Sequence, residues 1–445
     1  MKIVIAGAGR AGSLLAEMLY KDNEITIVDY DKSALDNLAG LSDVTSQLGN
    51  AQDPSLLQGL LSSGCDLFIS TLGDDRSNII ASSCAKNFGA ASVSALVSDM
   101  VYINNSILYE SILGIDYFLS PDQLTATDIA NFTESPGLLV SEEYGNDRIQ
   151  FYELRVWNQF KGSGKTLKEI MEVIKEKLVI GYIKSGRQVD IPTGETRINS
   201  GDILGIFGKH DSMARAVKIF TGDWDKKKRV VILGGTSISV QIIRALKDKV
   251  SVVKLFEKDK KRAEELSQIL SKYKVDVVND DPLDNRSQLM AVKDFDVFIA
   301  PTHDDERNVV ACLLAKDIGI PYAVSVIYNK QFGELVDRFG IDFSVIPYYS
   351  FLNKVLRIVY QNTVKHLLNI RGIEIAEFEI NKSFSFINKP LKDIRYDINC
   401  VVAGIIREGK PIIPSGDETI LENDRIVIVT NMEKFNDVRK IFIGR

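Results

Sequence analysis

A glycine-rich turn between two apolar segments at the start of the chain constrains the fold more than any other feature. Residues 2–6 form a short run rich in β-branched side chains, and they lead directly into the motif G-x-G-x-x-G at residues 7–12. Apolar residues then recur at helical spacing, and a second apolar run at 24–28 ends in Asp29. A strand, a glycine turn, a helix and a second strand ending in an acid about 20 residues on are the parts of a dinucleotide-binding βαβ unit.

Each residue of this unit has a distinct physical role. Gly7 permits the tight turn, Gly9 lets the backbone approach the phosphates, and Gly12 allows the helix to pack closely on the strand. The helix N-terminus presents unbonded N–H groups and the positive end of its dipole to the phosphates. Asp29 would accept hydrogen bonds from ribose hydroxyls. A cation such as Arg10 is unfavourable there without a nearby anion, so the sequence favours a nucleotide site over a vestigial loop.

Composition excludes several classes of protein. The 445 residues suggest about three domains of ~150 residues, or four smaller ones. The net charge of −6 provides no basic field for nucleic acid. No apolar run reaches the ~18 residues of a transmembrane helix, and the N-terminus does not resemble a signal peptide. The four cysteines and three histidines show no ligand spacing, so we expect a reducing compartment, no disulfide framework and no metal site.

The second half of the chain repeats the first. The landmarks Gly7, Asp29, Asp74, Asn78, Asp116 and Asp202 recur in the same order as Gly234, Glu257, Asp304, Asn308, Asp342 and Asp424. Strands that alternate with helices predict a doubly wound parallel sheet, and the β-rich stretches after them predict a smaller module.

The predicted fold class is therefore α/β, with two doubly wound parallel-sheet Rossmann-like domains, each followed by a small α+β module. The predicted domains are a first N-domain at residues 1–133, a first C-module at 134–225, a second N-domain at 226–368 and a second C-module at 369–445. Residues 225–229, one Asp followed by four basic residues, are interpreted as a solvated linker.

The second glycine loop keeps only the first glycine of the motif. Thr236 and Ser239 stand where the first loop has Gly9 and Gly12. A β-carbon at Thr236 would obstruct the approach of a phosphate, and Ser239 would crowd the contact between helix and strand. We interpret this loop as a degraded copy, and whether it binds a ligand or serves only the structure stays open at this point.

Taken with the doubled layout, these residues resemble the TrkA-type regulatory subunits of bacterial Trk/Ktr potassium-uptake systems, which have tandem RCK N- and C-domains. The resemblance rests on residues 7–12, Asp29, Gly49-Asn50, the two D-D-x-x-N helix starts and the paired modules. It implies a cytoplasmic protein, peripherally associated with the inner face of the cell membrane, that binds NAD(H) or ATP/ADP. It also implies a homo-oligomeric ring on a membrane-embedded Trk/Ktr-type potassium-translocating subunit, which the ring gates by nucleotide-dependent rearrangement.

The resemblance also implies a set of nucleotide contacts in the first N-domain. The glycines, Arg10 and Ala11 would surround the phosphates, Asp29 the ribose, and Asn50 with Ala51 the adenine. Thr71 and Leu72 would lie above the loop. The implied contacts are Gly7, Gly9, Arg10, Ala11, Gly12, Asp29, Asn50, Ala51, Thr71 and Leu72.

Two other functions are compatible with the same fingerprint. The first is an NAD-dependent dehydrogenase, which would need a general acid/base on a substrate domain, and neither small module shows such a constellation. The second is a structural ring scaffold whose nucleotide site is vestigial. We therefore predict no catalytic residues and favour a regulatory protein over an enzyme.

Three local predictions concern helices. Asp74 and Asp304 are interpreted as helix N-caps, with contact to a ligand or a cation as the alternative. The Asp-Pro pairs at residues 53–54 and 281–282 are interpreted as helix starts. Residues 351–368 carry an apolar stripe at helical spacing, so they predict one helix that either bridges subunits or packs on its own domain.

Overall fold

The computed structural model divides the chain into two compact units. One unit contains residues 1–125 and 346–355, and the other contains residues 126–345 and 356–445. The structure describes residues 1–443 apart from 22, 39, 42, 145–147, 187, 223–225, 330, 331, 334, 335, 337, 338, 361–365, 371, 383, 385 and 395–399. Asp225, the first residue of the predicted linker, therefore lies outside the described residues.

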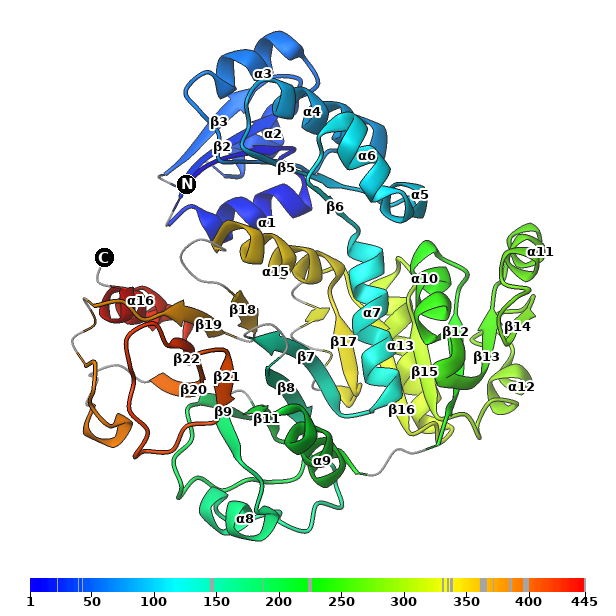
Figure 1. The fold of residues 1–445 in the computed structure, drawn as a ribbon. Helices are drawn as coiled ribbons and strands as arrows, with labels where there is room; N and C mark the ends of the chain where they lie inside the picture. Colours follow the sequence, from blue (N-terminus) through cyan, green and yellow to red (C-terminus); the bar gives the residue numbers. More distant parts are fainter. Residues whose placement is uncertain are drawn as a thin grey trace. The chain divides into compact units, whose positions relative to one another are not determined.

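Six parallel strands form the sheet of the first unit, in the order β3-β2-β1-β4-β5-β6 (Figure 1). The strands are β1 (Lys2–Ala6), β2 (Glu24–Asp29), β3 (Val44–Leu48), β4 (Leu67–Ser70), β5 (Ser92–Leu96) and β6 (Tyr117–Leu119). The helices between them are α1 (Arg10–Leu19), α2 (Lys32–Asp36), α3 (Pro54–Leu61), α4 (Asp75–Asn87), α5 (Met100–Asn104) and α6 (Ser106–Leu113). Strand order reverses between β1 and β4, and ligands of such sheets bind at the carboxyl ends beside that point.

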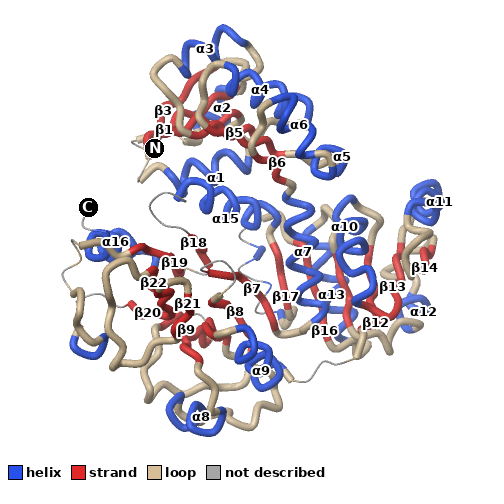
Figure 2. The backbone as a smooth tube through the Cα atoms, in the orientation of Figure 1, coloured by secondary structure: helices blue, strands red, loops and turns tan. Residues whose placement is uncertain are grey.

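A second parallel sheet repeats this topology in the other unit, in the order β14-β13-β12-β15-β16-β17. Its strands are β12 (Lys228–Leu233), β13 (Val250–Phe256), β14 (Val275–Val278), β15 (Val297–Ala300), β16 (Tyr322–Val326) and β17 (Phe343–Val345). Its helices include α10 (Ser237–Leu246), α11 (Lys260–Ile269), α12 (Arg286–Met290) and α13 (Asp305–Asp317) (Figure 2). Side chains of the central strands β12 and β15 are buried on both faces, as helices on both sides of a parallel sheet require.

The two small modules are antiparallel sheets of five strands with the same order of connections. The first has the order β10-β9-β11-β8-β7 and the second, read from its other edge, β21-β20-β22-β19-β18. The first contains β7 (Leu138–Tyr144), β8 (Ile149–Arg155), β9 (Leu178–Ser185), β10 (Gln188–Asp190), β11 (Ile203–Gly208), α8 (Leu167–Ile174) and α9 (His210–Thr221). The second contains β18 (His366–Ile370), β19 (Ile373–Glu379), β20 (Cys400–Arg407), β21 (Lys410–Ile412), β22 (Arg425–Asn431) and α16 (Phe435–Ile443). The predicted fold class is confirmed.

The two small modules share one hydrophobic core within the second unit. Tyr182 and Phe207 of the first module and Ile375 and Val429 of the second belong to the same buried cluster. The fit is close, because a β-carbon at Gly404 of the second module would lie 2.5 Å from the Ile149 side chain of the first. The modules are therefore packed together as one body, a pairing that the sequence analysis did not anticipate.

Helix α7 (Pro121–Glu134) joins the first parallel sheet to the rest of the chain. From Ala126 onward its residues belong to the second unit, where Ile129 and Phe132 are buried among core residues of the second parallel sheet. The Phe132 ring stacks on the Phe343 ring, with 4.9 Å between centroids. The last turns of this helix thus stabilise the second parallel sheet rather than the first.

The predicted helix over residues 351–368 is shorter than expected. Helix α15 spans Pro347–Tyr360, residues 361–365 lie outside the described part, and β18 begins at His366. The apolar stripe is buried at Leu352, Val355 and Val359. Residues 346–355 belong to the first unit although they follow the last strand of the second parallel sheet. The apolar residues at 367–368 continue the helical spacing in the sequence, but they belong to strand β18 of an antiparallel sheet.

The acids repeated near the ends of the domains stabilise the fold. Asp116 accepts a hydrogen bond from the Val93 N–H (2.7 Å) and pairs with Lys86 (3.0 Å). In the second half, Asp342 makes the same contacts with Ala323 (2.8 Å) and Lys316 (2.9 Å). These two repeated acids are therefore structural, and they do not contribute to a candidate binding site.

Candidate functional site

The glycine loop between β1 and α1 has the backbone geometry that the motif predicts. Gly7 has a φ of +102°, a conformation that residues with a β-carbon rarely adopt. A β-carbon there would lie 2.7 Å from the Thr71 carbonyl oxygen. At Gly12 a β-carbon would collide with the carbonyl oxygen of Gly7 itself. Both glycines are therefore required by the packing of the loop against α1 and the end of β4.

The N-terminus of α1 is open. Gly9 stands at the N-cap position with extended backbone, no side chain caps the helix, and the first turn contains no acid. No atom lies within 4 Å of the place that a β-carbon at Gly9 would occupy. Arg10 follows it and is exposed. A helix N-terminus with this backbone geometry attracts anions and offers its N–H groups to phosphate oxygens.

Asp29 links the end of β2 to the loop. Its Oδ2 accepts a hydrogen bond from the Ala8 N–H (2.6 Å), and its Oδ1 accepts one from the Asp31 N–H (2.9 Å). The carboxylate is half-buried at the carboxyl edge of the sheet. It therefore positions the loop as well as standing where a ribose would be recognised, a structural role that the sequence analysis did not include.

The other residues predicted to contact the nucleotide lie at the same edge of the sheet, but their hydrogen bonds and exposure differ. The Thr71 hydroxyl donates to the carbonyl oxygens of Ala6 (3.1 Å) and Gly7 (3.2 Å), which brings Thr71 to the loop. Asn50 is exposed after β3, and its side chain accepts a hydrogen bond from the Gln52 N–H (2.9 Å). Ala11 and Ala51 are buried.

Leu72 is held in place by Asn78. The Leu72 N–H donates to Asn78 Oδ1 (2.6 Å), and Asn78 Nδ2 donates to the carbonyl oxygens of Leu72 (3.1 Å) and Leu96 (2.9 Å). The fully buried Asn78 side chain therefore ties the end of β4 to the end of β5. Ligand contact by Leu72 and by the other residues of the predicted set stays a prediction.

The D-D-x-x-N motifs are structural in both halves. Asp74 caps α4 by accepting the Ser77 N–H (3.0 Å), and hydrogen bonding from Ser77 lowers the pKa of the Asp74 carboxyl. Asp75 accepts the N–H groups of Ser98 and Asp99 (2.9 and 2.8 Å). In the second half Asp304, Asp305 and Asn308 make the corresponding bonds. The interpretation of Asp74 and Asp304 as N-caps is confirmed.

The two Asp-Pro pairs differ. Asp53 caps α3 by accepting the Ser55 N–H (2.9 Å), and Pro54 is the first helical residue, as predicted. The prediction for residues 281–282 is wrong, because α12 begins at Arg286 with Asn285 as its cap. The Asp281 carboxylate accepts the Leu283 N–H, as Asp53 does with Ser55, and pairs with Arg307, but residues 282–284 form a turn and not a helix.

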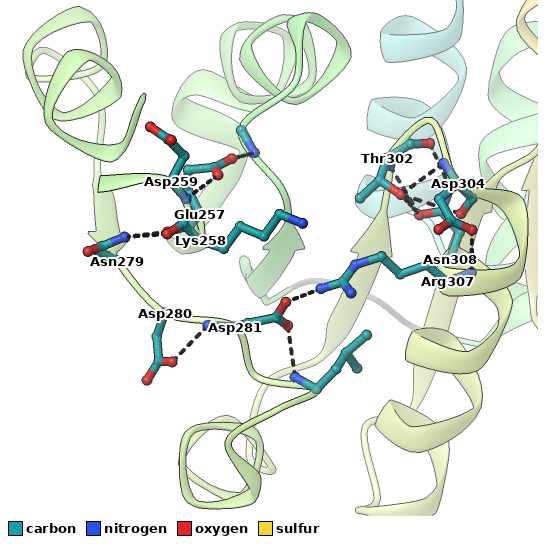
Figure 3. A network of polar contacts seen from close by, with 12 residues as sticks. Glu257, Lys258, Asp259, Asn279, Asp280, Asp281, Thr302, Asp304, Arg307 and Asn308 are labelled. Carbon is teal, nitrogen blue, oxygen red and sulfur yellow. Dashed lines mark hydrogen bonds and ion pairs between the residues drawn. The ribbon is translucent and has the colours of Figure 1, made fainter. Parts of the chain in front are cut away.

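The second glycine loop is closed by its own side chains. Gly234 keeps a positive φ of +87°. The Gly235 N–H donates to Oε2 of Glu257 (2.6 Å), the side chain labelled in Figure 3. The Ala8 N–H donates to Asp29 in the same way in the first loop. The Thr236 hydroxyl caps α10 by accepting the Ser239 N–H (3.2 Å). The Ser239 hydroxyl donates to the Gly234 carbonyl oxygen (2.5 Å). The expected crowding at Ser239 is therefore absent, because a hydrogen bond accommodates its side chain.

The Thr236 cap could have been found in the sequence, because threonine directly before an apolar-periodic stretch is a favoured N-cap residue. The pairing of Asp281 with Arg307 could not, because no spacing rule relates two residues on different strand–helix connections. Among the described residues, the structure contains no group of three or more His, Cys, Asp or Glu able to hold a metal ion. Nor does any helix in the described ranges have the length and apolarity needed to cross a bilayer.

The cysteines provide a check on the packing. Burial raises the pKa of the Cys65 and Cys400 thiols to about 11, and it raises the pKa of the fully buried Cys312 thiol as well. The thiolate is the reactive form, so at pH 8 a thiol with such a pKa is about one part in a thousand reactive. We expect iodoacetamide to modify the half-buried Cys84 first, Cys65 and Cys400 only as the pH rises towards 11, and the fully buried Cys312 only when the protein unfolds. Peptide mass spectrometry would measure this order, and rapid modification of native Cys65 at pH 8 would contradict it.

Comparison with known proteins adds the following findings. The family model described as TrkA-N domain matches residues 3–121 and 230–347, and the one described as TrkA-C domain matches residues 375–443. A Trk system potassium uptake protein TrkA homolog from Archaeoglobus fulgidus is 27% identical over 99% of this chain and 100% of its own length. The Trk system potassium uptake protein TrkA of Haemophilus influenzae is 26% identical over 99% and 98%. A solved structure of the GsuK channel bound to NAD is 16% identical, covers all of this chain and 79% of its own, and has a TM-score of 0.63.

Proposed function

Because this chain belongs to the TrkA family, we propose that it is a nucleotide-binding regulatory subunit of a potassium-uptake system. It would lie in the cytoplasm at the inner face of the cell membrane and act on a membrane-embedded Trk/Ktr-type potassium-translocating subunit. The relatives from A. fulgidus and H. influenzae support this role, since both carry Trk potassium-uptake names and match over nearly their whole lengths.

The observation that carries the proposal is the open N-terminus of α1 beside the acid at the end of the adjacent strand, Asp29. The uncapped helix start and the empty space at Gly9 fit a phosphate group, and Asp29 stands at the end of the adjacent strand. Arg10 is exposed in the first turn, where it can pair with a phosphate oxygen. These features support NAD(H) or ATP/ADP as the ligand, and the NAD bound to the GsuK channel is of the same class.

The remaining contacts complete the proposed site. Asn50 and Ala51 would flank the adenine, since they follow β3 next to the strand that ends in Asp29. Thr71 and Leu72 would border the loop from the end of β4. The boundaries of the four domains, at residues 133, 225 and 368, likewise stay predictions.

Regulation would follow from a difference in affinity between two arrangements of a homo-oligomeric ring. A ligand shifts such an equilibrium only by as much as it binds one arrangement better than the other. The first N-domains of neighbouring chains would move when the nucleotide binds, and the second N-domains would hold the ring together. In this proposal the nucleotide binds at the open loop of residues 7–12, and its binding free energy there shifts the equilibrium between the two arrangements.

A dehydrogenase and a scaffold are the alternatives. The carboxylate and amide side chains beside the first loop are engaged in backbone hydrogen bonds, as Asp29, Asp75 and Asn78 show. This arrangement supports binding without chemistry. Steady turnover of a nicotinamide cofactor with candidate substrates would support the enzyme instead. If the chain bound none of NADH, NAD, ATP and ADP, that result would support the scaffold.

The first experiment is calorimetric titration of the full chain with NADH, NAD, ATP and ADP, with the number of sites per chain fitted. We expect one site per chain for the preferred nucleotide. Asp29→Ala removes both the ribose contact and the bond to the Ala8 N–H, so it is expected to weaken binding about tenfold or more.

The matched control is Glu257→Ala, which removes the corresponding acid of the second N-domain and its bond to the Gly235 N–H. We expect this variant to bind the nucleotide as the unmodified chain does. If Glu257→Ala lost the site and Asp29→Ala kept it, the ligand would be bound by the second N-domain and the proposed site would be wrong.

A further inference from the structure

An ion pair spans the carboxyl edge of the second parallel sheet. The Arg307 guanidinium, in the first turn of α13, pairs with Asp281 Oδ2, which follows β14 (Figure 3). Asp281 is only 8% exposed, and its Oδ1 accepts the Leu283 N–H (3.1 Å). The carboxylate is therefore used on both oxygens, and the pair is shielded from water on the Asp281 side.

The position of this pair follows from the strand order. In the order β14-β13-β12-β15, two strands separate β14 from β15, the strand that precedes α13. Asp281 follows β14 and Arg307 follows β15, so the pair bridges the carboxyl ends of the two strands between them, β13 and β12. The space above these strand ends is called the crevice here. A nucleotide bound to a sheet of this type lies across those strand ends. The ion pair crosses the crevice in the direction that a ligand would take.

The Arg307 end of the pair is supported by hydrogen bonds of its own helix start. Asp304 caps α13 by accepting the Arg307 N–H (2.9 Å). Asn308 Oδ1 accepts the Thr302 N–H (3.1 Å), and its Nδ2 donates to the Val326 carbonyl oxygen (2.9 Å). The backbone that carries Arg307 is therefore fixed to the ends of β15 and β16, so the pair joins two structured segments.

The first N-domain has no such connection at the corresponding positions. Asp53 stands in place of Asp281 and caps α3, and Ser77 stands in place of Arg307. The Ser77 hydroxyl donates to the Asp74 carboxylate of its own helix start (2.5 Å). The same segments are thus joined by a side-chain pair in the second N-domain, whereas Asp53 and Ser77 of the first form only local hydrogen bonds.

We propose that the second N-domain is held closed by its own side chains, with the Arg307–Asp281 pair and the Thr236 cap in the roles that a nucleotide has in the first N-domain. The hydroxyl of Thr236 bonds an N–H group that a phosphate would otherwise use, and the ion pair joins the two sides of the crevice. That a nucleotide has these roles in the first N-domain rests on the proposed function. The Arg307–Asp281 ion pair, called the clamp below, does not. Nucleotide would then change the first N-domain and leave the second unchanged.

Hydrogen exchange of the full chain without nucleotide tests the clamp directly. Arg307→Ser places the residue of the first N-domain at this position. We expect it to raise the exchange rates of amides in residues 279–285 about tenfold or more, because the segment after β14 loses its connection to α13. Arg244→Ser, which replaces an exposed arginine near the end of α10, is the control and should leave those rates unchanged. Unchanged rates in Arg307→Ser would overturn the proposal.

A variant that gains nucleotide binding in the second N-domain would test whether its side chains close that site. The triple variant Thr236→Gly, Ser239→Gly and Arg307→Ser restores the residues that the first N-domain has at all three positions. Calorimetry with the preferred nucleotide is expected to give two sites per chain in place of one. A folded triple variant with one site would overturn the closure, and so would nucleotide protection of residues 234–240 in the unmodified chain. Failure of the proposed function would look different. The unmodified chain would then bind no nucleotide at residues 7–12, whereas the faster exchange expected in Arg307→Ser does not depend on nucleotide.

Discussion

Replacing Gly9 by valine is expected to weaken nucleotide binding by roughly two orders of magnitude or more and to leave the fold intact. The space beside Gly9 is open, with no atom within 4 Å of an added β-carbon, and its φ of −69° suits any residue. The added side chain would occupy the phosphate position and prevent two charge-assisted hydrogen bonds from backbone N–H groups. Such bonds contribute about 1.5–3 kcal/mol each, and each 1.4 kcal/mol corresponds to about a factor of ten in affinity.

Two further glycines make this experiment specific. Gly12→Ala is expected to reduce both binding and stability, because its β-carbon collides with the Gly7 carbonyl oxygen. Gly59→Ala, in α3 with open space around it, should change neither affinity nor fold. Calorimetry and far-UV circular dichroism would measure both quantities. Undiminished affinity in Gly9→Val would show that the phosphates do not approach this loop.

Replacing Asn78 by alanine is expected to destabilise the first unit by about 3–5 kcal/mol. The Asn78 side chain is fully buried and bonds three backbone groups, the N–H and carbonyl of Leu72 and the carbonyl of Leu96. Alanine would leave these partly buried groups without their partner, at about 1–3 kcal/mol each before relaxation and access of water. The ends of β4 and β5 would separate, so the change should appear in urea unfolding followed by circular dichroism.

The comparison for Asn78 lies on the same helix. Asn87, at the end of α4, donates to the Ser83 carbonyl oxygen (2.8 Å) and is exposed, so Asn87→Ala should cost less than about 1 kcal/mol. Asn308→Ala should reproduce the large effect in the second unit, because Asn308 makes the corresponding bonds to Thr302 and Val326. Equal small effects of Asn78→Ala and Asn87→Ala would contradict the structural role assigned to the motif.

The parts of this protein that could be predicted are those coded by local patterns. The helix caps at Asp53, Asp74 and Asp304 were predicted from residue type and spacing, because a cap bonds an N–H two or three residues away. The predicted helix start at Asp281 failed because only a turn follows at residues 282–284, although the Asp281 carboxylate accepts the Leu283 N–H as a cap would. The helix predicted over residues 351–368 ends earlier, at Tyr360, because residues 366–370 form β18. This strand pairs with β19, and such pairing is decided by the partner strand.

The amino-acid order alone was enough to predict the doubled layout, the two parallel sheets and the open glycine loop at residues 7–12. Each depends on covalent neighbours, on periodicity, or on a glycine at a positive φ that residues with a β-carbon rarely adopt. The shared core of the two small modules, the transfer of α7 to the second parallel sheet and the Arg307–Asp281 pair became visible in three dimensions. They join segments far apart in the chain, and such contacts depend on which strand ends and sheet faces the fold brings together.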